Sequence, residues 1–136
     1  AGKTYLACAF GTAASRGFYS VRYIRLPDLL VEISVARTNG TYRDYMKRLR
    51  KEKLLILDEW LLYPLKETVA RDVLELVEAR NKVASTIFCS QYDTIEWHEN
   101  LYDPTLADAI CDRIIYNAYT IQIEGESMRK RKGIPE

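Results

Sequence analysis

This sequence has little histidine and cysteine, almost no net charge and no long hydrophobic run. A single histidine, His98, and three cysteines without a CxxC pair argue against a zinc site. No apolar stretch approaches the roughly 20 residues that a transmembrane helix needs, so we expect no membrane partner. The net charge of +1 is too small for overall charge to attract nucleic acid, so any such affinity must come from local patches.

The three cysteines, Cys8, Cys89 and Cys111, are odd in number, and each lies in an apolar stretch. Disulfides are rare in the reducing cytosol, where unpaired cysteines behave as small buried hydrophobes. The sequence therefore predicts three buried free thiols and a cytoplasmic location.

At 136 residues, with 48% hydrophobic and 29% charged residues, the chain is predicted to form one soluble domain. Apolar residues at helical spacing and in short runs alternate along it. Helices are predicted over residues 3–15, 27–39, from Thr41 onward, 66–80 and 103–117, and strands over residues 20–25, 54–57, 85–90 and 119–123. Thr41 is expected to cap its helix, with Asp44 in capping-box position. This alternation predicts an α/β fold with a parallel, doubly wound sheet, followed by a loose tail over residues 124–136.

The most informative segment is the run of four large apolar residues, 54–57, followed by Asp58 and Glu59. Such a run is typical of a strand buried on both faces of a parallel sheet. Ligands of open α/β sheets bind at the carboxyl ends of the strands. Asp58 could hold Mg²⁺ through water, and Glu59 could accept a proton from an attacking water or orient it. Alternatively, the two acids only cap the next helix.

The chain begins with Gly2-Lys3-Thr4, which matches the end of the phosphate-binding pattern G-x-x-x-x-G-K-[ST]. Gly2 would let the backbone approach a phosphate, Lys3 would neutralise the β- and γ-phosphates, and Thr4 would ligate Mg²⁺. Read alone, the same three residues could form a surface turn with a solvated lysine. Because the first glycine of the pattern and its strand would precede residue 1, we expect the chain to be part of a longer protein.

Two further polar sites follow predicted elements. Ser90 and Gln91 end a strand, where they could reach the γ-phosphate and the hydrolytic water, or could simply form a turn. Arg113 could act in the site of a neighbouring subunit as an arginine finger. From spacing alone, a solvated arginine or a salt bridge with Asp112 or Asp108 is favoured instead.

A basic cluster lies between residues 43 and 53, where six basic residues stand against two acidic ones, a local net charge of +4. Tyr42 and Tyr45 are interleaved with it. Such a segment could bind a nucleic-acid backbone, and a solvated helix face explains it almost as well. The candidate DNA-binding residues are Arg43, Lys47, Arg48, Arg50 and Lys51.

Taken together, several segments resemble the IstB family of AAA+ ATPases, which assist insertion-sequence transposases and are related to DnaC-type replicative helicase loaders. The segments are LLILDEW (54–60), TIFCSQ (86–91), Trp97-His98, DPTLADAI (103–110) with Asp112-Arg113, and GESMRK (125–130). The resemblance covers nearly the whole chain. Its most specific part is the run 97–130, which also favours the transposition branch.

The resemblance implies an AAA+ core with strand order 5-1-4-3-2, whose first strand and most of whose Walker A loop precede residue 1. It implies ATP and Mg²⁺ as ligands. Lys3 and Thr4 would lie in Walker A, Asp58 and Glu59 in Walker B, and Ser90-Gln91 at the first sensor. It also implies Arg113 as the finger, nucleotide contact by Arg129, and DNA contacts by the two helices before Walker B.

The implied function is that of a bacterial ATPase that forms homo-oligomers on DNA, with nucleotide at the subunit interfaces, and hands DNA to a transposase. The nearest alternative is a loader of a hexameric replicative helicase. A phosphotransferase of small metabolites and an inactive DNA-binding module are the alternatives from other classes.

Overall fold

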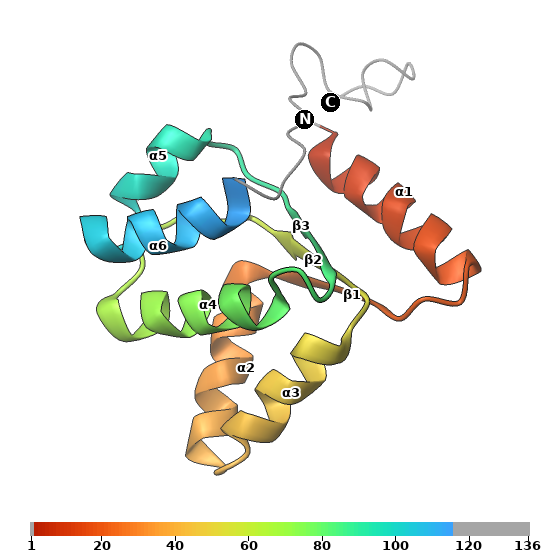
Figure 1. The fold of residues 1–136 in the computed structure, drawn as a ribbon, viewed down its shortest axis with the longest axis horizontal. Coiled ribbons are helices and arrows are strands. Elements are labelled where there is room, and N and C mark those ends of the chain that lie inside the picture. The colour runs from red at the N-terminus through yellow and green to blue at the C-terminus, as the bar shows by residue number, and fades with distance from the viewer. Residues whose placement is uncertain (1, 116–136) are drawn as a thin grey trace.

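The computed structural model describes residues 2–115, in which three strands alternate with six helices (Figure 1). The strands are β1 (Val21–Arg25), β2 (Leu54–Asp58) and β3 (Ser85–Phe88). The helices are α1 (Lys3–Arg16), α2 (Leu26–Thr38), α3 (Tyr42–Lys51), α4 (Glu67–Arg80), α5 (Thr94–Glu99) and α6 (Pro104–Ile115). The predicted strand 119–123, the tail 124–136 and Arg129 lie outside the described residues.

The three strands form one parallel sheet in the order β1-β2-β3, which confirms the predicted α/β class. With the first expected strand placed before residue 1, β1, β2 and β3 correspond to strands 2, 3 and 4 of the expected order 5-1-4-3-2, and they are neighbours in that order. β2 is central, and all five of its residues are buried, as the apolar run at 54–57 predicts. β1 carries the charged side chains of Arg22 and Arg25 at the outside of the sheet, where strands commonly place charge.

The helices cover the two faces of the sheet unequally, with α1 on one side and the other described helices on the other (Figure 1). Because side chains alternate along a strand, Leu54 and Ile56 face α1, while Leu55 and Leu57 join the larger core. The same alternation places Asp58 on the α1 side. α1 can approach closely because Gly11 has no side chain; a Cβ there would lie 3.1 Å from Ile56 Cδ1.

Some local predictions were wrong. Thr41 does not cap α3 with its side chain; its hydroxyl donates to the Ala36 carbonyl oxygen at 3.4 Å. α5 was not predicted, although Asp93 caps it by accepting from the backbone N–H groups of Ile95 and Glu96. Cys8 is exposed, whereas Cys89 and Cys111 are buried free thiols as predicted.

The described helices are all too short or too polar to cross a lipid bilayer.

Candidate functional site

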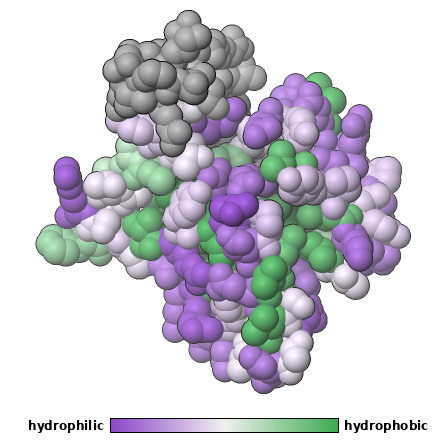
Figure 2. Space-filling view, turned by 180° about the vertical axis from the view of Figure 1, so that it is seen from behind, coloured by the Kyte–Doolittle hydropathy of each residue, from purple (hydrophilic) through white to green (hydrophobic). Residues whose placement is uncertain are grey.

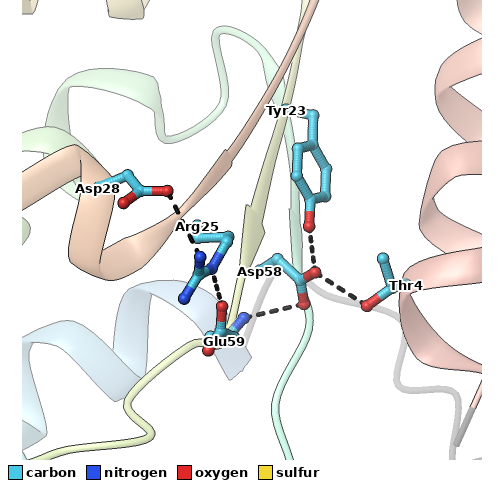
Figure 3. A network of polar contacts seen from close by, with 6 residues as sticks. All are labelled: Thr4, Tyr23, Arg25, Asp28, Asp58 and Glu59. Atoms are coloured by element: carbon cyan, nitrogen blue, oxygen red, sulfur yellow. Dashed lines mark hydrogen bonds and ion pairs between the residues drawn. The ribbon is translucent and has the colours of Figure 1, made fainter.

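Asp58, at the carboxyl end of β2, is the centre of a hydrogen-bond network that joins α1, β1 and β2 (Figure 3). Its carboxylate is almost buried, with 8% of the residue exposed. Oδ2 accepts from the Thr4 hydroxyl at 2.8 Å, and Oδ1 accepts from the backbone N–H of Glu59 at 2.9 Å. Two segments 54 residues apart, Gly2-Lys3-Thr4 and Asp58-Glu59, therefore meet at one edge of the sheet.

The first turn of α1 is suited to an anion. Gly2 precedes the helix in the left-handed conformation, with φ of 84°, which glycine adopts without strain. No side chain caps this end and its first turn contains no acidic residue, so the first N–H groups carry the positive end of the helix dipole. The 14-residue helix thus presents its N-terminus and the Thr4 hydroxyl at the same edge as Asp58.

Lys3 and Asp58 both act electrostatically on the thiol of Cys89. Burial, followed by the negative charge of Asp58, raises the pKa of the Cys89 thiol to about 11, and the positive charge of Lys3 acts in the opposite direction. Cys89 directly follows β3, and its backbone N–H donates to the Leu57 carbonyl at 2.9 Å. The charges of Lys3 and Asp58 therefore both act on Cys89, a group at the carboxyl end of the sheet.

Sequence reasoning did not identify Tyr23, whose hydroxyl donates to Asp58 Oδ2. Burial and the neighbouring carboxylate raise the pKa of Tyr23 well above its ordinary value. The phenol therefore stays protonated and remains a donor at physiological pH. Tyr23 belongs to β1, and its alternation with Ile24 could have indicated its face, but nothing in the sequence gives the distance to Asp58.

Glu59 forms an ion pair with Arg25, the last residue of β1 (Figure 3). The hydrogen bond to Glu59 is the main cause of a raised pKa of Arg25. Glu59 itself has a left-handed backbone, with φ of 52°, a conformation that costs free energy in a residue with a side chain. Asp28 lies 4.0 Å from the other side of the Arg25 guanidinium. The predicted catalytic acid is thus held by a cation that the sequence analysis did not select.

Ser90 and Gln91 follow β3, next to the carboxyl end of β2. The Ser90 hydroxyl oxygen accepts from the Trp97 indole N–H at 3.0 Å and from the Tyr92 backbone N–H at 3.1 Å. Gln91 is exposed. The structure brings both residues to the predicted edge, with Ser90 fixed by the loop that leads into α5.

Arg113 lies on α6, and the structure does not bring it to Asp58. Its guanidinium forms a salt bridge with Glu78 of α4 at 3.0 Å and donates to the Ala109 carbonyl at 2.8 Å. A salt bridge with Asp112 or Asp108 was one of the alternatives for Arg113, and the structure shows a salt bridge with Glu78 on the neighbouring helix. The packing of α4 against α6 explains this choice.

The basic cluster is displayed on α3, but its tyrosines are not available for stacking. Arg43, Lys47, Arg48, Arg50 and Lys51 are all exposed. Tyr45 is 6% exposed, and the Tyr42 hydroxyl donates to Glu75 at 2.6 Å while Arg37 covers its ring. Both tyrosines are therefore engaged within the fold, and the exposed candidates for DNA binding are the five cations.

Seen from behind, hydrophilic residues predominate over the part of the surface formed by α2 and α3, with some hydrophobic residues between them (Figure 2).

The donor set at Asp58 suits a hard cation shared with a phosphate ligand. Within residues 2–115, no three His, Cys, Asp or Glu side chains converge into a metal site made by protein alone. Mg²⁺ commonly binds through one or two protein oxygens, waters and substrate phosphates. Asp58 and Thr4 supply such oxygens, and the hydroxyl proton of Thr4 points to Asp58, which leaves its oxygen lone pairs for a metal.

Comparison with known proteins places the chain among ATP-binding proteins. The pattern of the protein family described as "IstB-like ATP binding protein" matches residues 1–134. An insertion sequence ATP-binding protein of Sinorhizobium fredii, y4pL, is 44% identical over 131 residues, which are 96% of this chain and 54% of the relative. The ATP-binding protein of insertion sequence IS232 from Bacillus thuringiensis is 34% identical over 94% of this chain and 51% of its own length. The chain thus spans about half the length of the curated relatives it matches.

Two solved structures share the fold at low sequence identity. AMPPCP-bound DnaA from Aquifex aeolicus matches with a TM-score of 0.71 and 20% identity, over 80% of this chain and 34% of that one. The DnaC helicase loader matches with a TM-score of 0.67 and 19% identity, over 82% of this chain and 68% of that one. At these identities the likeness establishes the fold alone.

Proposed function

We propose, since this chain belongs to the family of IstB-like ATP-binding proteins, that it is the ATPase core of a factor that assembles on DNA and assists a transposase. ATP and Mg²⁺ would bind at the edge formed by α1 and β2. Oligomers would form on DNA with nucleotide between subunits, and hydrolysis would weaken these interfaces. ATP use then acts as a timer for assembly.

The observation that carries this proposal is the 2.8 Å hydrogen bond between Thr4 and Asp58. It brings the end of a phosphate-loop pattern and a strand-end acid together, although 54 residues separate them in the chain. A surface turn and a helix cap, the alternatives for the two motifs, would give no reason for this contact. An uncapped helix N-terminus beside the pair adds the binding element for a triphosphate.

Each residue of the site then has a distinct task. Gly2 and the N–H groups that follow it would hold phosphate oxygens, and the ammonium of Lys3 would neutralise the β- and γ-phosphates. Thr4 and Asp58 would hold Mg²⁺, which polarises the phosphates when bound. Glu59 would orient the attacking water and accept its proton.

Other predicted residues would complete the site from further away. Ser90 and Gln91, at the carboxyl edge of β3, would sense the γ-phosphate. Arg113 would serve a neighbouring subunit as the finger, after exchanging its salt bridge with Glu78 for contacts to phosphate. Arg129 would add a nucleotide contact from beyond the described residues.

The ion pair between Arg25 and Glu59 supports a regulated site, in which the position of the Glu59 side chain controls ATP hydrolysis. A hydrogen bond from the guanidinium occupies Oε2 of the carboxylate and fixes its position. Glu59 would therefore have to part from Arg25 before it could activate water. Oligomer formation on DNA is the event that we propose for this release.

DNA would contact α3, whose exposed cations form no salt bridge among the described residues. Arg43, Lys47 and Arg50 recur at helical spacing on one side of the helix. Such a row can follow a phosphate backbone without reading base sequence.

The test of the proposal is Glu59→Gln in the full-length protein, with Glu99→Gln as a control at an exposed position of α5. The glutamine keeps the shape of the side chain but cannot accept the proton. We expect ATP binding to persist and DNA-stimulated hydrolysis to fall by about a hundredfold or more. Hydrolysis that is no slower in Glu59→Gln than in the control would refute the assignment of the site.

A helicase loader is the second candidate, favoured by the structural match to DnaC. Affinity purification of the full-length protein from its host distinguishes the two. Recovery of a transposase supports the first proposal, and recovery of a replicative helicase without transposase would reverse it.

A further inference from the structure

We propose that Tyr23 is a positioning residue of the magnesium site, because its hydroxyl determines which oxygen of Asp58 faces the metal. This inference rests on the proposed function, since it requires ATP and Mg²⁺ to bind beside Thr4 and Asp58. It concerns a residue of β1 that belongs to neither of the two motifs that meet at this edge.

The Asp58 carboxylate can accept only a limited number of hydrogen bonds. An ionised aspartate offers about four lone-pair directions, two on each oxygen. Both directions on Oδ2 are filled, one by the Thr4 hydroxyl and one by the Tyr23 hydroxyl. Oδ1 accepts one hydrogen bond, from the Glu59 backbone N–H. The free direction is therefore on Oδ1, and Mg²⁺, which usually keeps several waters, would be reached there through a metal-bound water.

The fold explains why a tyrosine can do this from β1. In the parallel register Tyr23 lies beside Ile56, and Asp58 is two residues further along β2 on the same face of the sheet. The side chain must therefore extend along the strand direction by about two residues, roughly 6–7 Å, to reach the carboxylate. A phenol spans this length, whereas serine or threonine at the same position would not.

Loss of the Tyr23 hydroxyl would remove one of the hydrogen bonds that fix the orientation of the Asp58 carboxylate. Oδ2 would regain a free direction, and the aspartate could turn to offer either oxygen to the metal-bound water. Residues that orient metal ligands typically contribute about 10- to 100-fold to metal affinity. Tyr23 is 41% exposed, so removal of one oxygen is not expected to disturb the core.

The experiment compares Tyr23→Phe with wild-type full-length protein and with Tyr19→Phe, which removes a hydroxyl from an exposed tyrosine of the preceding turn. Mn²⁺, as a paramagnetic substitute for Mg²⁺, is titrated by electron paramagnetic resonance in the presence of a non-hydrolysable ATP analogue. Binding of the same analogue is measured separately in EDTA. A third variant carries 3-fluorotyrosine at position 23, which keeps both ring and donor.

We expect Tyr23→Phe to raise the Mn²⁺ dissociation constant about tenfold, with metal-free nucleotide affinity and thermal melting unchanged. Tyr19→Phe and the fluorotyrosine variant should match the wild type. An Mn²⁺ dissociation constant within twofold of the wild type would overturn the inference and leave the proposed function intact. Equal weakening of metal-free nucleotide binding, or a lowered melting temperature, would identify a structural role instead. Absence of nucleotide binding by the wild type would overturn the proposed function itself.

Discussion

Arg25, at the end of β1, forms an ion pair with Glu59, the residue that follows β2. The two strands are hydrogen-bonded neighbours, and their register places Arg25 beside Asp58. A cation on the outer strand thereby controls the position of an acid that follows the central strand.

Replacement of Arg25 by alanine should release Glu59. We expect the rate of ATP hydrolysis without DNA to rise about three- to tenfold, because the freed carboxylate can approach the water without an external trigger. Stimulation by DNA should shrink in proportion. Steady-state hydrolysis with and without DNA measures both effects in the full-length protein.

Arg71→Ala is the matched control for this experiment, since Arg71 is exposed and its salt bridge within residues 2–115 is with Glu67, one turn away on α4. It should leave both rates unchanged. A fall in basal hydrolysis in Arg25→Ala would mean that the ion pair holds Glu59 in its working position and not away from it.

Neutralisation of the row Arg43, Lys47 and Arg50 should weaken binding of duplex DNA and reduce its dependence on salt. Each lost phosphate contact lowers the slope of log K against log salt by about 0.9, so the triple alanine variant should lose about two to three units of slope. Fluorescence anisotropy over a range of salt concentrations gives this slope. The triple variant Lys66→Ala, Arg71→Ala and Lys82→Ala loses the same charge from other exposed positions. Equal changes in both variants would indicate a nonspecific effect of net charge.

Arg80 should be important for stability and not for catalysis. It is 2% exposed and donates to the carbonyl oxygens of Leu49, Glu52 and Ser85 and to the Thr86 hydroxyl. These bonds tie the ends of α3 and α4 to the start of β3. Arg80→Ala leaves several buried acceptors without a donor, so the free energy of unfolding should fall by about 3 kcal/mol or more. Urea unfolding measures the loss, and Arg71→Ala should change it by less than about 0.5 kcal/mol.

Alkaline pH should destabilise the fold through its buried thiols. Burial raises the pKa of Cys89 and of Cys111 from 9.0 to about 11, so the neutral thiol is favoured in the folded state. This stabilisation is complete below pH 9 and is lost as the pH rises through 11. Two pKa units correspond to roughly 2–3 kcal/mol for each thiol. Cys89→Ala and Cys111→Ala should each flatten the dependence of the unfolding midpoint on pH between 9 and 11.

Much of the fold could be predicted because the decisive signals are local. The apolar run 54–57 predicted a strand buried on both faces, and β2 is that strand. Asp103-Pro104 marked the start of α6, which Asp103 caps through the Leu106 N–H. The resemblance to the IstB family, read from short motifs, is confirmed by the family match.

The parts that could not be predicted depend on register and on contacts between distant segments. Tyr23 and Arg25 matter only because β1 pairs with β2 in one register, and no pattern within β1 encodes that pairing. The burial of Tyr45 likewise depends on how α3 packs beside α2. Cys8 was misassigned because α1 is rich in small and apolar residues all round, so its sequence does not mark the face that contacts the sheet.

The unequal covering of the sheet has a mechanical consequence. Among the described elements α1 alone packs on its side, over a small core of Ala7, Leu54, Ile56 and Cys89. Because Thr4 belongs to α1 and Asp58 to the sheet, any tilt or slide of the helix separates the two oxygens that would share a cation. Ligand binding at this edge and packing of α1 against the sheet are therefore coupled. A ligand that contacts both Thr4 and Asp58 would stabilise the packing of α1 on its small core.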